Sequence, residues 1–144
     1  MPLGDRSDPY VGFRFLVEID GIAVARFSEV SGLQIEIETE TYEEGGVNDF
    51  VYHFPKRAKY QNLVLKRGIT DGQELWQWHQ DVVNGIIRRK NGSIILLDSN
   101  GEEKWRWNFV QAFPIKWTGP ELKADSSNIA FETIELVHQG IKKG

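Results

Sequence analysis

The chain has 144 residues and a formal net charge of −4, and apolar residues make up 40% of it, including five Trp, eight Phe and four Tyr. This length and apolar content predict a single domain, 1–144, with a hydrophobic core rather than a disordered chain. The absence of cysteine excludes disulfides, thiolate metal sites and cysteine nucleophiles, and the acidic balance disfavours a nucleic-acid binder that relies on a basic surface.

The first half of the chain predicts short strands joined by tight turns. Residues 1–10 read as an irregular arm, and they lack the apolar segment of a secretory signal. Residues 11–20 alternate apolar and polar side chains, as a half-buried strand does, and Asp20-Gly21 predicts a hairpin turn into 22–27. A long hairpin is expected over 33–54, with its second strand ending at Pro55. Another strand is expected over 60–66.

The second half predicts one helix and more strands. Apolar residues at helical spacing indicate a helix over 71–88, begun by capping-box pairs Thr70/Gln73 or Asp71/Glu74. Cations at its end suit the helix dipole: Arg88, Arg89 and Lys90. Strands are expected over 93–97, 104–113, 115–118 and 129–138. The fold class is therefore mainly β, an antiparallel sandwich or barrel with one flanking helix.

The stretch QIEIETETYEEGG, residues 34–46, alternates acidic and uncharged positions along a predicted strand. Glu36, Glu38 and Glu40 would share one face, about 7 Å apart, where each pair repels by roughly 0.6 kcal/mol in bulk water. Between Phe27 and Pro55 there are seven acids and no Lys or Arg, whereas 56–70 holds five bases and no acid. These blocks could pair within one hairpin or between two subunits, and the charges alone favour neither.

A search for catalytic or ligand-binding motifs predicts no catalytic residue, cofactor or metal. The three histidines, His53, His79 and His138, fall on different predicted elements without metal-ligand spacing. An acid/base hydrolase is disfavoured because no environment separates the pKa values of two carboxylates. Trp105 and Trp107 leave an alternative, a carbohydrate-binding module, although their alternation with polar residues favours core positions against Trp76 or Trp78.

Several motifs resemble the tail-tube protein family of contractile phages and phage-like extracellular contractile injection systems. The resemblance runs from Phe13 to Gly140. Its most specific pieces are FSEVSGL (27–33), YEEGG (42–46), LKRG (65–68), P-x-K-W (114–117), LKAD (122–125) and ETIELVHQG (132–140). One departure is the segment FPKRAKY (54–60), which is basic and has no Gly where many members are rich in Pro and Gly.

The resemblance implies a non-enzymatic structural protein. Homo-hexameric rings would stack into an inner tube that carries cargo, surrounded by a sheath protein and joined to baseplate and spike proteins, without membrane insertion or specific nucleic-acid binding. Assembly would take place in the cytoplasm, in a virion or a particle released from the cell. A role as the tube-initiator ring stays open beside that of the main tube.

The resemblance also implies roles for the hairpin. Glu36, Glu38 and Glu40 would face the lumen, while Ile35 and Ile37 would pack on the core. The candidates for contacts between subunits are Lys56, Arg57, Lys59, Glu43, Glu44 and Asp49.

Overall fold

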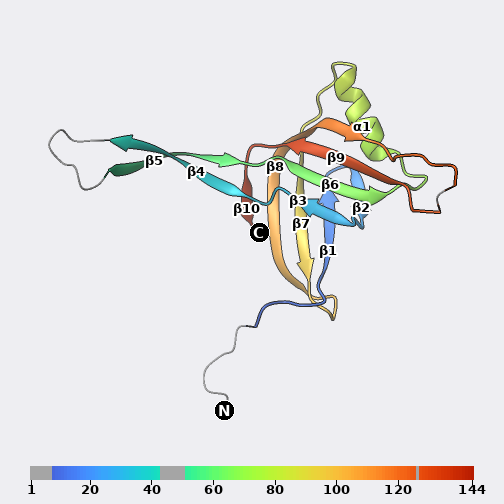
Figure 1. The fold of residues 1–144 in the computed structure, drawn as a ribbon, viewed down its shortest axis with the longest axis horizontal. Helices are drawn as coiled ribbons and strands as arrows, with labels where there is room; N and C mark the ends of the chain where they lie inside the picture. The colour runs from blue at the N-terminus through green and yellow to red at the C-terminus, as the bar shows by residue number, and fades with distance from the viewer. Residues whose placement is uncertain (1–7, 43–50, 126) are drawn as a thin grey trace, which may run out of the picture.

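The computed structural model describes residues 8–42, 51–125 and 127–144. In this part the chain is mostly antiparallel β-structure with one helix, which confirms the predicted fold class, although the sheet does not close into a barrel (Figure 1). The elements are β1 (Arg14–Ile19), β2 (Ile22–Ala25), β3 (Glu29–Ser31), β4 (Ile35–Tyr42), β5 (Tyr52–Tyr60), β6 (Leu63–Gly68), α1 (Glu74–Val83), β7 (Lys90–Leu97), β8 (Glu103–Thr118), β9 (Phe131–Val137) and β10 (Ile141–Lys143).

The body of the molecule is one bent sheet organised around the long strand β8. Its strand order is β2-β1-β7-β8-β9-β6-β3, and β10 pairs with β8. The first part of β8 pairs with β7 and β10, and its last part, from Phe113, pairs with β9. Between the two parts Gln111 has a φ of +55°, and β8 uses one more residue than β7 there. A bulge of this kind bends a strand, so β8 passes from one half of the sheet to the other.

A single buried cluster joins the two halves of the sheet and the helix. Strands β6 and β9 bury alternate side chains, and their register places Leu63 opposite Leu136 and Leu65 opposite Ile134. Each fully buried aliphatic side chain of this size contributes roughly 1.5–3 kcal/mol. The same cluster includes Val17, Ile94 and Phe109 from the other half, and Leu75 and Trp78 from α1.

A buried ion pair lies near one end of β6 and β9, at positions that continue the alternation of buried side chains. Arg67 lies opposite Glu132, and both are buried. Glu132 accepts a hydrogen bond from Arg67 Nε at 3.0 Å and another from Trp117 Nε1 at 2.9 Å. Arg67 also reaches Glu74, the first residue of α1, at 3.4 Å. This network ties the start of the helix to the sheet.

The helix is shorter than the sequence predicts, and its ends differ from the expected ones. It begins at Glu74, and its N-cap residue Gln73 makes no side-chain capping bond. The predicted capping pairs are wrong: Thr70 accepts a hydrogen bond from the amide of Gly72, and the carboxylate of Glu74 binds Arg67. The chain leaves the helix after Val83, so the cationic run 88–90 does not form its last turn.

Those three cations have other partners near the body. The guanidinium of Arg88 lies 3.3 Å from the carboxylate of Asp81. The backbone carbonyl of Arg88 accepts a hydrogen bond from Trp78 Nε1 at 2.8 Å. Arg89 lies over the ring of Phe113, and Lys90 starts β7 and lies over Trp78. Cations over aromatic faces are attracted by the ring quadrupole, so Arg89 and Lys90 have favourable contacts away from the helix end.

Strand boundaries also differ from the predictions. The expected strands 104–113 and 115–118 are one strand, β8, and the short strands β3 and β10 were not predicted. Strand β5 does not end at Pro55 but continues to Tyr60. Proline is compatible with edge strands and bulges because its missing amide donor is not needed there. Strand β5 is such an edge, and its pairing with β4 is irregular beside Pro55.

Candidate functional site

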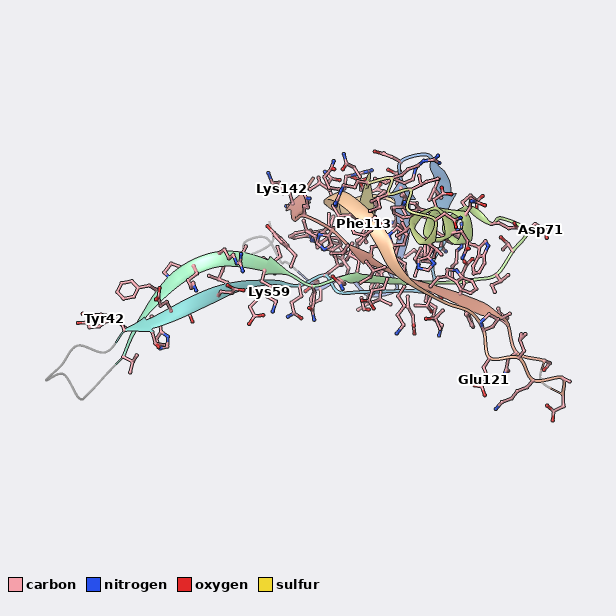
Figure 2. All side chains as sticks on the ribbon, turned by 90° about the horizontal axis from the view of Figure 1, so that it is seen from above. Tyr42, Lys59, Asp71, Phe113, Glu121 and Lys142 are labelled. Carbon is pink, nitrogen blue, oxygen red and sulfur yellow. The ribbon has the colours of Figure 1, made fainter. Side chains whose placement is uncertain are left out.

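The hairpin of β4 and β5 projects from the body as a long two-stranded ribbon (Figure 1). Figure 2 shows Tyr42 at its far end and Lys59 closer to the body. Within the described residues, each of the two strands pairs only with the other. A two-stranded hairpin is marginal on its own in water, so this ribbon is a candidate surface for assembly with other chains.

One face of the ribbon is apolar and uncovered. Ile35 and Ile37 are 53% and 52% exposed, and the register places Tyr60 and Ala58 opposite them on the same face. The prediction that these two isoleucines pack on the core of their own chain is wrong. The ribbon lies away from that core, so the described part of the chain leaves this face open (Figure 2).

The other face carries the charges. Arg57 Nε lies 3.4 Å from a carboxylate oxygen of Glu38, and Lys59 lies directly opposite Glu36 on the neighbouring strand. Glu40 lies opposite Phe54, and Lys56 is exposed. The acidic and basic blocks therefore meet within the hairpin at Arg57 and Glu38. The remaining contact candidates, Glu43, Glu44 and Asp49, lie outside the described residues.

The base of the ribbon is fixed to the body by His138, which follows β9. The amide of Gly140 donates to His138 Nδ1 at 3.1 Å, so Nε2 carries the proton and donates to the Gln61 carbonyl at 2.8 Å. The ring of Tyr60 meets the His138 ring edge-on at 5.7 Å. No local pattern in the sequence indicates this anchor, because its two sides are 77 residues apart.

A second anchor at the base is Gly32, just before β4. Its φ is +94°, and a Cβ built on it would lie 1.9 Å from the carbonyl oxygen of Asn62. Only glycine combines this backbone conformation with so close an approach. The two connections to the ribbon, before β4 and after β5, are thus held side by side.

Core positions are predicted for Trp105 and Trp107, and the structure places only Trp107 against the core. Trp105 is 38% exposed and stacks on Trp107 with ring centroids 5.5 Å apart, while Trp107 packs against the core cluster. Neither stacks on the helix: Trp76 instead meets Trp117 edge-on at 4.6 Å. Lys143 from β10 lies 4.2 Å over the Trp105 ring, so a ring face of the kind that stacks on sugars is already occupied by a cation.

The described part of the chain shows no other cluster with obvious chemistry. It contains no group of three or more His, Asp or Glu side chains placed to hold a metal ion. None of its helices has the length and apolar character needed to cross a membrane. His53 and His79 lie on β5 and α1, separate from His138.

Solved structures with the same fold come from contractile injection machines. A chain of the six-fold symmetrised anti-feeding prophage baseplate matches with a TM-score of 0.86 and 27% identity, over 96% of this chain and 97% of that one. A chain of the PVC sheath-tube complex matches at 0.83 and 29%, over 94% and 91%. One from the PVC sheath/tube terminator matches at 0.81 and 30%, over 96% and 98%.

A family model settles the relationship that the motifs suggested. Among curated proteins no relative matches the sequence significantly. The model of the T4-like virus tail tube protein gp19, however, matches residues 11–142, nearly the whole chain. Together with the three structures, this match identifies a tail tube protein of the contractile-injection type. The chain belongs to the T4-like gp19 tail tube family.

Proposed function

We propose that six copies of this chain form a ring, and that rings stack into the inner tube of a contractile injection machine. The observation that carries the proposal is the projecting ribbon, whose apolar face at Ile35 and Ile37 is not covered by residues 8–42, 51–125 or 127–144 of the same chain. In a ring, the neighbouring copy would cover that face. The six-fold symmetry of the anti-feeding prophage baseplate supports the copy number.

The opposite face would line the lumen. Glu36, Glu38 and Glu40 would face water there, with Arg57 and Lys59 beside them. The charged groups keep this part of the wall hydrated and give cargo little apolar surface on which to adhere. Farther along the same face, the exposed ring of Phe54 lies opposite Glu40. The chain would act as a structural conduit without catalysing a reaction, with a sheath outside it and a baseplate with its spike at one end. Assembly would take place in the cytoplasm, before any release of the particle.

The likeness to a baseplate chain supports a second candidate, the ring that initiates the tube. An initiator would sit between the spike and the main tube, and it would form one ring rather than a long stack. The two candidates share the ribbon and the ring, so they differ only in how many rings stack.

Negative-stain electron microscopy of the purified chain, with light scattering, tests the proposal. Hollow tubes or rings with six-fold end views are expected at high protein concentration and low salt. Long tubes would indicate the main tube, and single rings the initiator. A monomer under every condition, including in the presence of the matching baseplate, would refute the proposal.

A variant of the apolar face sharpens this test. Ile37→Asp should abolish rings because it places a carboxylate where the neighbouring copy covers the ribbon, while thermal unfolding of the body stays unchanged. Val83→Asp is the matched control, because Val83 is 63% exposed and lies on α1, away from the ribbon. Rings formed equally well by Ile37→Asp would show that this face is not an interface.

A further inference from the structure

The two free edges of the ribbon set the geometry of any extension of this sheet. Strand β4 has a strand partner on one side only among the described residues, and so does β5, so each has an outer edge with no neighbouring strand there. Copies related by rotation about a ring axis keep their strand directions. The outer edge of β4 in one copy would therefore meet the outer edge of β5 in the next copy in antiparallel fashion, continuing the pattern within the chain.

These two strands carry opposite charge. Strand β4 holds three acids and no base: Glu36, Glu38 and Glu40. Strand β5 holds three bases and no acid: Lys56, Arg57 and Lys59. A head-to-tail ring would thus place each acidic strand between two basic strands. Pairing of β4 with β4, or of β5 with β5, would instead oppose like charges directly across the strands, which is destabilising.

Most of these charged side chains form no ion pair within the part of the chain that the structure describes. Among the described residues, the ion pair of Arg57 with Glu38 is the one that joins the two strands, and the Arg57 side chain is 84% exposed. Glu36, Glu40, Lys56 and Lys59 make no ion pair with any described residue. Their charges are available to a strand that arrives at either outer edge.

From this complementarity, which rests on the ring of the proposed function, we propose that strand charge sets the direction of subunit pairing. The acidic strand β4 pairs with the basic strand β5 of a second copy, and like charges disfavour its pairing with another β4. The device favours head-to-tail closure over two-fold dimers, in which identical edges meet. It also makes the lumen wall charge-balanced rather than uniformly acidic over the described strands.

Two charge-reversed variants test the proposal. The first carries Glu36→Lys, Glu38→Lys and Glu40→Lys, so both strands are basic. The second carries Lys56→Glu, Arg57→Glu and Lys59→Glu, so both strands are acidic. Each variant alone should lose the rings that the wild-type chain forms. An equimolar mixture should recover them, because every β4–β5 contact between unlike copies is again complementary.

Native mass spectrometry of the mixed rings gives the decisive readout. Strict alternation requires equal numbers of the two variants in each ring, whereas pairing that ignores charge gives a statistical distribution. Circular dichroism of each variant checks that the body, from which the ribbon projects, stays folded. A control with Glu121→Lys and Lys123→Glu exchanges an exposed ion pair outside the ribbon and should assemble as the wild type does.

The outcomes separate this inference from the proposed function. If the wild type forms rings and either variant alone does so equally well, or the mixture fails to recover them, charge does not direct the pairing and the tube function stands. If the wild type forms no rings under any condition, the proposed function fails, and this inference fails with it.

Discussion

Replacing Glu132 with Gln should destabilise the body strongly, because one buried carboxylate serves two donors. Glu132 is 4% exposed, and its two oxygens accept from Arg67 Nε at 3.0 Å and Trp117 Nε1 at 2.9 Å. A glutamine side chain has one acceptor oxygen, so one of these donors would meet an amide NH₂ group. The guanidinium of Arg67 would also lose its buried counter-charge.

The magnitude follows from the remaining contacts. Removing one partner of a buried ion pair costs about 3–5 kcal/mol. Arg67 keeps its weaker contact with Glu74 at 3.4 Å, which places the loss near the lower end, about 3 kcal/mol. For a chain of this length a loss of that size lowers Tm by roughly 10 °C. Thermal and urea unfolding at concentrations that show no light scattering would measure it.

The same change elsewhere on β9 provides a matched control. Glu135 accepts one hydrogen bond, from Asn62 Nδ2 at 3.0 Å, and a glutamine can still accept it. Glu135→Gln should therefore cost less than about 0.5 kcal/mol. Equal losses from Glu132→Gln and Glu135→Gln would refute the reasoning. The double change Arg67→Met with Glu132→Leu should recover most of the stability, because no buried charge is left unpaired.

Three further changes probe other parts of the chain. Gly32→Ala should cost about 3 kcal/mol or more in urea unfolding, because its Cβ would meet a carbonyl oxygen at a φ of +94°. Trp78→Phe removes the bond to the Arg88 carbonyl and leaves a cavity in the buried cluster, so it should cost about 2 kcal/mol or more by the same measurement. The backbone amide of Glu74 and the nearby Arg67 lower the Glu74 pKa, so its stabilisation exists above about pH 4.5 and is lost in acid. The stability gap between wild type and Glu74→Gln should accordingly narrow as the pH falls below about 4.5, and a constant gap would contradict this.

The sequence predicted the elements whose pattern is long and regular. Alternation found β6 and β9, and the turn at Asp20-Gly21 joins β1 to β2, with Gly21 at a φ of +74°. The three-residue strands β3 and β10 are too short to show any period, so nothing in the sequence marked them. The bulge at Gln111 could not be predicted, because no glycine marks its positive φ. The order of the strands does not follow from local patterns, so the overall architecture was predicted from the resemblance to the tail-tube family.

The hairpin shows a different limit of pattern reading. The alternation at Ile35 and Ile37 correctly indicated a face that is apolar, but it cannot say which chain covers that face. The prediction that the cations at 88–90 end the helix was wrong for a related reason. Its charges suited a helix end, yet Asp81, Phe113 and Trp78 offered other partners that only the folded chain brings near.

Strand β8 has a mechanical consequence. Because its 16 residues carry ladder hydrogen bonds to β7 and β10 first and to β9 later, the two halves of the sheet share a covalent backbone. A pull on one half reaches the other along the backbone of β8 as well as through the buried cluster that joins them. The halves should therefore yield together, as a single rupture when one molecule is stretched, and a protomer under load would behave as one stiff element rather than two hinged plates.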